Sequence, residues 1–148
     1  MTENHGAMIA KFLTAQDQVY PTALHELRAG RKETHWMWFI FPQLAGLGQS
    51  ETSRLYALHD LEEARAFAGH PILGARLDEC TEAVLLHAPD GVAPRDLGSI
   101  FGTPDDKKFI SSMTLFARAL PEHRLFRAAL SAFYGGHEDE RTVALLAS

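Results

Sequence analysis

The chain has 148 residues, of which 46% are hydrophobic and 22% charged, the composition of an ordinary globular protein. This length is typical of one domain and allows a core to form without disulfide bonds or metal ions. The formal net charge of -5 argues against general nucleic-acid binding, which needs a large basic surface. A single cysteine, Cys80, excludes an internal disulfide bond and makes a reducing compartment the default.

Targeting and membrane patterns are not found in the sequence. The first ten residues, Met1–Ala10, contain no basic segment followed by an apolar stretch, so we expect no secretory signal. No apolar run approaches the roughly 20 residues that a helix needs to span a bilayer. We therefore expect a cytoplasmic protein that makes no contact with a membrane.

The first predicted helix begins near Ile9 and ends at Gly30. Apolar residues recur at helical spacing from Ile9 to Leu27. Pro21 interrupts this pattern and predicts either a kink or the first turn of a new helix. Gly30 suits the end of the helix, and Arg28 is favourably placed in the last turn.

The most informative segment is HWMWFIFPQ, residues 35–43, which contains both tryptophans of the chain. Its six central apolar residues fit either a strand or a short buried helix that Thr34 would cap and Pro42 would end. The helical surroundings favour the helix. In a helix, Trp36 and Trp38 would point about 200° apart, so that at most one would face a ligand. In a strand, both would share a face.

Three helices are predicted after a glycine-containing loop at 44–49. Their expected ranges are 50–58, 60–69 and 71–84. Ser50 would cap the first, while Asp60 and Glu63 have the spacing of a capping box that opens the second. Pro71 suits the first position of the third helix, which is followed by a loop.

The C-terminal third carries further helix signals. Thr103 would cap a helix with Pro104 in its first position, and two aspartates would complement the positive end of the helix dipole. Pro121 would begin another helix that the glycine pair 135–136 ends, and Asp139 would cap a last short helix. All 148 residues are therefore predicted to form one compact all-α domain of several short helices.

Candidate functional groups gather around the tryptophans. The sequence lacks phosphate-loop and zinc motifs, so no metal or cofactor is expected. His35 would act as an acid or base near neutral pH, or would equally well bond a helix end beside the core. Arg31 and Lys32 would hold a phosphate or carboxylate, or form a solvated helix end. Trp36 would stack on a flat ligand or belong to the core, and the Gln43 carboxamide closes the segment.

A second group of candidates lies on the predicted helix after Pro104. Asp105, Lys108 and Ser112 share a helix face, and Ser111 lies beside it. These side chains would orient a water molecule or hold a sugar; alternatively they form a helix start with a surface ion pair of about 0.3–0.5 kcal/mol. Serines disfavour the middle of a helix, which suggests another role unless their hydroxyls bond back to the helix.

Three strings of the sequence resemble the domain of unknown function 1810 family, from about Lys11 to Leu146. They are GRKETHWMWFIFPQLAGLGQSETSRLY, HPILGARLDECTEAVL and IFGTPDDKKFISSMTLF. The resemblance implies a small, mostly helical, single-domain cytoplasmic protein and supplies no activity. Some bacterial members carry the label "calpastatin", but nothing here resembles an inhibitory repeat of that disordered inhibitor. The second string, with an aspartate-containing motif after it, is vaguely similar to the NADAR group of ADP-ribose glycosidases.

Three interpretations of these residues are open. The first is a small hydrolase or N-glycosidase that acts on an ADP-ribose-like nucleotide, with Asp105 as the acid–base or water-orienting group and the basic side chains on phosphates. The second is a non-catalytic domain that binds a nucleotide, another small molecule or a protein. The third makes both segments fold determinants, in which case no concave pocket is lined by both His35 and Lys108. The sequence fixes neither an enzymatic activity nor an oligomeric state.

Overall fold

The computed structural model of the protein describes residues 5–148, and in that range the chain is helical. The helices are α1 (Gly6–Ala29), α2 (Met37–Ile40), α3 (Glu51–Leu55), α4 (Leu61–Gly69), α5 (Pro71–Leu85), α6 (Leu97–Phe101), α7 (Asp105–Ala119), α8 (Leu125–Tyr134) and α9 (Glu140–Ala147). The described residues form no strand, and the predicted all-α domain is confirmed. The first four residues, with the start of the Met1–Ala10 segment, lie outside the described range.

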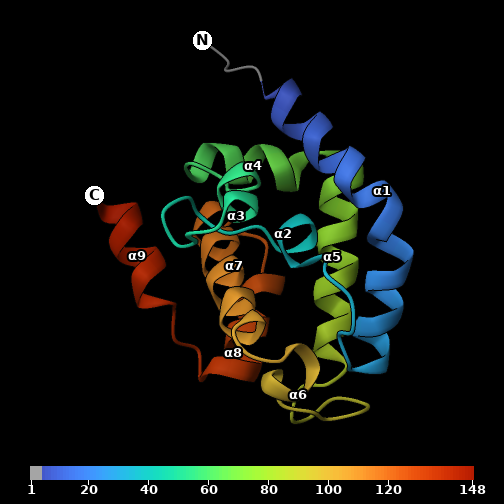
Figure 1. Cartoon of the computed structure of the whole chain (residues 1–148). Coiled ribbons are helices and arrows are strands. Elements are labelled where there is room, and N and C mark those ends of the chain that lie inside the picture. The colour runs from blue at the N-terminus through green and yellow to red at the C-terminus, as the bar shows by residue number, and fades with distance from the viewer. Residues whose placement is uncertain (1–4) are drawn as a thin grey trace.

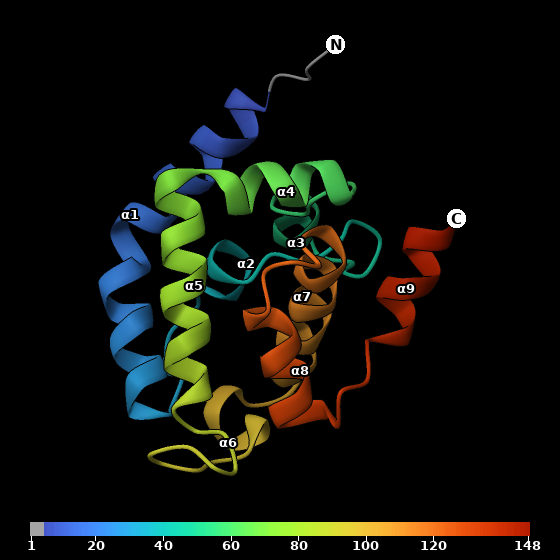
Figure 2. The same cartoon turned by 180° about the vertical axis from the view of Figure 1, so that it is seen from behind.

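The helices form two groups with the short helix α2 between them. Helices α1 and α5 lie side by side, and α7 packs on α8 (Figures 1 and 2). Helix α4 crosses one end of these groups, α6 closes the other end, and α9 packs on the outside of α7 (Figure 1). Within residues 5–148, no helix is both long enough and apolar enough to cross a membrane.

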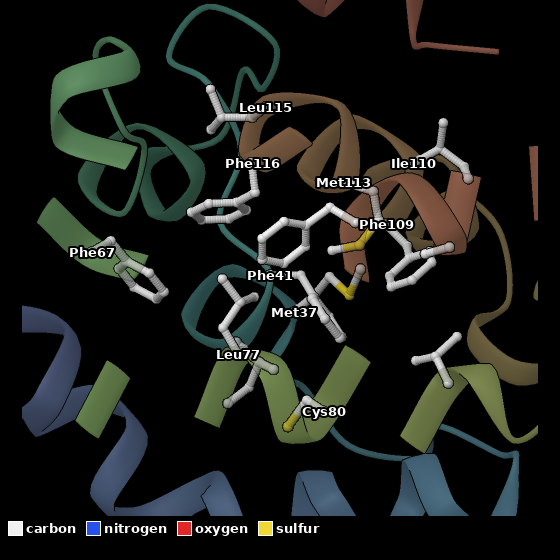
Figure 3. Packing of buried hydrophobic residues seen from close by; sticks show 14 of the residues in the cluster. Met37, Phe41, Phe67, Leu77, Cys80, Phe109, Ile110, Met113, Leu115 and Phe116 are labelled. Atoms are coloured by element: carbon white, nitrogen blue, oxygen red, sulfur yellow. The ribbon is translucent and has the colours of Figure 1, made fainter. Parts of the chain in front are cut away.

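The centre of the HWMWFIFPQ segment is part of the core. Met37 and Phe41 lie between side chains of α5, such as Leu77, and side chains of α7, such as Phe109 (Figure 3). The ring of Phe41 meets the ring of Phe109 edge-on, with centroids 5.0 Å apart. Such aromatic pairs contribute about 0.5–1.5 kcal/mol beyond the burial of their area. Cys80 is buried in the same cluster, as predicted, and burial raises the pKa of its thiol to about 12.

The predicted short buried helix in this segment is confirmed, but its predicted cap is wrong. Helix α2 begins after Trp36, and no side chain caps it. The Thr34 hydroxyl donates instead to the carboxylate of Glu26, at 2.8 Å. Thr34 lies two residues before Trp36, the residue that precedes the helix, so it does not occupy the capping position.

Two caps in the middle of the chain are confirmed. The Ser50 hydroxyl accepts from the N–H of Ser53 at 3.1 Å, and the Asp60 carboxylate accepts from the N–H of Glu63 at 2.8 Å. The Glu63 carboxylate accepts from the N–H of His59, at 2.9 Å, which is one residue before the N–H of Asp60 that a reciprocal capping box uses.

Helix α3 is shorter than predicted and ends at Leu55. The reason is a backbone pairing with the loop that precedes it. The N–H of Leu58 donates to the Gln43 carbonyl at 2.9 Å, and the Leu58 carbonyl accepts from the N–H of Ala45 at 2.7 Å. This pairing holds Leu58 in extended backbone and brings the two sides of the loop together.

The start of α7 differs from the prediction. Pro104 is the residue before the helix, and Thr103 makes no side-chain cap. The Pro104 carbonyl accepts from the N–H groups of Lys107 and Lys108 at 3.0 and 3.2 Å, so the backbone itself closes the first turn. Asp105 is therefore the first helical residue.

Two other prolines do not begin a helix. Helix α1 continues through Pro21 as a single helix, so no new helix begins there. Helix α8 begins at Leu125 rather than Pro121. A turn closed by the N–H of His123 on the Leu120 carbonyl, at 3.0 Å, lies between Pro121 and the helix.

The end of α1 at Gly30, which the sequence predicted, is packed against the chain after α5. Gly30 has a φ of 76°. The carbonyl of Leu27 lies 2.8 Å from Nε2 of His87, and the carbonyl of Gly30 accepts from Nε of Arg95 at 2.8 Å. The Leu27 carbonyl also accepts from the N–H of Gly30, at 3.0 Å. These contacts join the end of α1 to the chain after α5.

We predict that Gly30→Ala lowers the free energy of unfolding by roughly 2–4 kcal/mol, measured by urea denaturation. An added Cβ would lie 2.7 Å from Cδ of Arg95 and 2.9 Å from Cε1 of His87. Gly135→Ala is the matched control, because Gly135 also ends a helix in the left-handed region and its added Cβ would lie 3.4 Å from His137. The control should cost only the backbone strain, about 1–2 kcal/mol. Equal losses in the two variants would contradict the role of the close packing.

Candidate functional site

One buried carboxylate organises the segment between α1 and α2. Glu26 is 6% exposed. It accepts hydrogen bonds from the N–H groups of Glu33 and Thr34, at 2.9 and 3.1 Å, and from the Thr34 hydroxyl at 2.8 Å. The indole N–H of Trp36 also donates to it, at 2.8 Å. Trp36 is 0% exposed, so its ring belongs to the core and is not available to a ligand.

The electrostatics of Glu26 follow from this arrangement. Burial by itself would raise the pKa of Glu26. The hydrogen bonds from the Glu33 backbone, the Trp36 ring and Thr34 outweigh burial and lower the pKa below its ordinary value of 4.5. The carboxylate is therefore charged at neutral pH, and its charge is compensated by four donors rather than by a cation.

Three residues that the sequence placed in a candidate site form an ion-pair cluster. Nζ of Lys32 lies 3.0 Å from one oxygen of Asp105, and Nζ of Lys108 lies 3.3 Å from the other. The side chains of Lys32 and Asp105 are only 7% and 20% exposed. Lys32 also donates to the carbonyl of Thr34 at 2.6 Å. The cluster therefore ties the segment before α2 to the start of α7.

Each lysine of the ion-pair cluster also lies over a tryptophan ring. Nζ of Lys32 is 5.1 Å from the ring centroid of Trp36, and Nζ of Lys108 is 5.0 Å from that of Trp38. These distances are in the range of cation–π contacts. Trp38 is only partly buried, unlike Trp36, so the two rings occupy different environments as a helix predicts.

The other predicted site residues do not join the cluster. Arg31 is exposed and forms only a long ion pair of 3.7 Å, and His35 is exposed with no hydrogen bond or ion pair to any described residue. The Ser111 hydroxyl bonds back to the Lys107 carbonyl at 3.1 Å. Ser112 is 0% exposed, and its hydroxyl has no partner within residues 5–148.

A pocket with a volume of about 180 Å³ lies next to the ion-pair cluster. Trp38 belongs to both, because its ring lines the pocket and also lies beneath Lys108. The polar and aromatic side chains that line the pocket are Trp38, Gln43, Ser53, Arg54, Tyr56 and His59. We call this the Trp38 pocket. Neither His35 nor Lys108 lines it.

The polar lining of the Trp38 pocket is neutral or basic. None of its lining residues carries a carboxylate, although the chain has a net charge of -5. The guanidinium of Arg54 makes no hydrogen bond or ion pair with any described residue. Nδ1 of His59 lies 3.0 Å from the Glu63 carboxylate, which leaves Nε2 of the ring for other partners. The pocket is therefore suited to an anionic group.

Sequence reasoning identified Gln43 and considered Trp38, but it missed Arg54, Tyr56 and His59. These three residues flank Leu58, whose backbone pairs with the chain beside Gln43. Their convergence depends on that pairing, and no local pattern indicates it. Glu26 was also missed, although a carboxylate within the buried stripe of α1 is a visible signal.

The chain belongs to the family described as "Protein of unknown function (DUF1810)", whose model matches residues 7–146. Its fold is similar to the crystal structure of the conserved hypothetical protein Rv1873 from Mycobacterium tuberculosis, with a TM-score of 0.87. The two sequences are 52% identical, and the match covers 95% of this chain and 96% of that chain. No curated protein matches this sequence, so the similarity to ADP-ribose glycosidases stays a prediction.

We predict that Glu26→Gln lowers the free energy of unfolding at pH 7 by roughly 2–4 kcal/mol, because an amide cannot accept all four hydrogen bonds. The pKa of Glu26 is lowered in the folded state, so its contribution is present above pH 4.5 and is lost as the pH falls below that value. The difference in the free energy of unfolding between wild type and variant should therefore become smaller below pH 4.5. Glu82→Gln, at an exposed position on α5, is the control. A difference in unfolding free energy that does not change with pH would contradict this role of the carboxylate.

We predict that Asp105→Asn destabilises the fold by roughly 1–3 kcal/mol, because it leaves the shielded ammonium of Lys32 without its counter-ion. Asp106→Asn is the matched control, because Asp106 also lies in the first turn of α7 and makes no ion pair with any residue from 5 to 148. Thermal unfolding of both variants separates the ion pair from the helix dipole. Equal shifts in melting temperature would show that the ion-pair cluster does not contribute to the stability of the fold.

Proposed function

We propose that this member of the DUF1810 family binds a small anionic molecule with a planar group in the Trp38 pocket and does not transform it. The observation that carries the proposal is the guanidinium of Arg54, an exposed residue at the lining of the pocket that pairs with no described residue, while the lining itself includes no carboxylate. An unpaired cation beside an aromatic ring, in a chain of net charge -5, favours a ligand of the opposite charge.

The dimensions of the pocket support a ring-sized group. A volume of about 180 Å³ is close to that of an engineered cavity that holds benzene, about 150 Å³. The Trp38 ring offers a surface for stacking, while Gln43 and Tyr56 add polar groups at the lining. Pockets that enclose drug-sized ligands measure about 300–1,000 Å³, so a dinucleotide would extend beyond this pocket.

The hydrolase hypothesis receives less support from the same geometry. Both oxygens of Asp105 are ion-paired with lysines, and Asp105 does not line the Trp38 pocket. His35 is exposed and does not line it either. An N-glycosidase would need a carboxylate near the sugar, and the pocket lining supplies none. Binding without turnover is therefore the better supported of the two functions.

We predict that nicotinate binds more tightly than nicotinamide, because the two share a ring and differ in charge. The quenching of tryptophan fluorescence on titration measures both affinities. Arg54→Ala should weaken nicotinate binding at least tenfold, which corresponds to about 1.4 kcal/mol. Arg31→Ala is the matched control, since both arginines are exposed and only Arg54 lines the pocket. AMP and adenosine form a second pair, in which the charged AMP should bind more tightly than the neutral adenosine.

Two outcomes would contradict the proposed function. The first is equal binding of the charged and neutral member of each pair, or equal losses in Arg54→Ala and Arg31→Ala. The second is turnover of NAD or ADP-ribose that Asp105→Asn abolishes while the variant remains folded, which would support the hydrolase hypothesis instead.

A further inference from the structure

The C-terminal helix α9 lies against the outer side of a loop that lines the Trp38 pocket (Figures 1 and 2). Two side chains of α9 make the contact. Nη2 of Arg141 donates to the Leu47 carbonyl at 3.3 Å. The methyl groups of Leu145 lie 3.4 and 3.5 Å from the position of a Cβ added to Gly46. Gly46 lines the pocket itself, so only one layer of backbone separates α9 from the cavity.

The start of α9 is fixed to the rest of the molecule independently of this loop. The N–H of Asp139 donates to the Thr114 hydroxyl at 2.9 Å. The Glu138 carboxylate binds Arg118 and Arg127, each at 2.7 Å, and the hydrogen bond from Arg118 is the main cause that lowers the pKa of Glu138 to about 2. Thr142 is 0% exposed. The first turn of α9 is therefore anchored on α7 and α8, whereas Arg141 and Leu145 hold the loop.

The loop presents Gly46 on the side that faces α9. Gly46 has a φ of 103°, a conformation that suits glycine and leaves no side chain between α9 and the pocket. The loop is held at its base by the backbone pairing of Leu58 with Gln43 and Ala45. On its inner side, Leu44 and Leu47 are buried in the core. On its outer side, residues 46 and 47, which we call the Gly46 wall, contact Leu145 and Arg141 of α9. Helix α9 therefore restrains the outer side of the Gly46 wall.

We infer that Arg141 and Leu145 are positioning residues for the Trp38 pocket. Helix α9 holds the Gly46 wall closed, and a ligand that needs this wall strengthens the docking of α9 by the same free energy with which α9 strengthens ligand binding. The ligand side of this inference rests on the proposed function. The structural side, that α9 closes the pocket, rests only on the contacts of Arg141 and Leu145.

Acrylamide quenching of tryptophan fluorescence tests the structural side without a ligand. Trp36 is 0% exposed, and Trp38 lines the same pocket as Gly46, so Trp38→Phe identifies the share of Trp38 in the quenching. We expect the double variant Arg141→Ala/Leu145→Ala to raise the quenching constant of Trp38 at least twofold. Arg141→Lys keeps a donor and should restore part of the protection.

Two control variants distinguish a displacement of the loop at Gly46 from a general loss of stability. Glu140→Ala changes an exposed side chain of the same helix and should match wild type. Leu97→Ala lowers stability through α6, at the end of the molecule opposite α4 (Figure 1), and should leave the quenching of Trp38 unchanged. Unchanged quenching in the double variant, or equal increases in Leu97→Ala, would overturn the inference.

The ligand arm uses nicotinate with the full chain. The double variant should bind nicotinate at least threefold more weakly than wild type and Glu140→Ala. If quenching rises as expected but wild type binds neither nicotinate nor AMP, the wall inference stands and the proposed function fails. If wild type and the double variant bind nicotinate equally, the coupling between α9 and the ligand is wrong.

Discussion

The carboxylate of Glu26 is the interaction on which the rest of the candidate region depends. Its four hydrogen bonds fix the chain between α1 and α2 in one conformation, although that segment contains no regular structure. The direction in which α2 begins follows from this. Trp36 is held in the core, Lys32 is brought to Asp105, and Trp38 is left partly exposed. A buried charge of this kind is stable only while every donor is in place, so the segment is ordered as a unit.

The two groups of polar residues near the tryptophans have different physical characters. In the ion-pair cluster every charge has a partner, and both oxygens of Asp105 are occupied. In the Trp38 pocket the guanidinium of Arg54 has none among the described residues. The paired charges have no free valence for a ligand, whereas the exposed guanidinium at the lining of the pocket is available for binding. Trp38 connects the groups, because Lys108 lies over its ring and the pocket lies beside it.

The sequence predicted those features that local chemistry determines. Capping by Ser50 and Asp60 involves residues three positions apart, and the end of α1 at Gly30 needs only a residue that tolerates a positive φ. The shared helix face of Asp105 and Lys108 was predictable because these residues are also three positions apart. The cap at Thr34 was predicted wrongly because the helix begins only after Trp36, in a segment that the distant carboxylate of Glu26 holds in place. The Trp38 pocket was not predictable, because it forms only where Leu58 pairs with the chain near Gln43.

The most direct test of the division between a structural and a binding tryptophan is an NMR titration with nicotinate, in which the two indole N–H signals are followed. Trp38→Phe assigns them. We predict that the Trp38 signal moves to saturation, because its ring lines the pocket. The Trp36 signal should stay constant, because Glu26 holds its N–H at 2.8 Å. A moving Trp36 signal beside a constant Trp38 signal would contradict the assignment of the pocket.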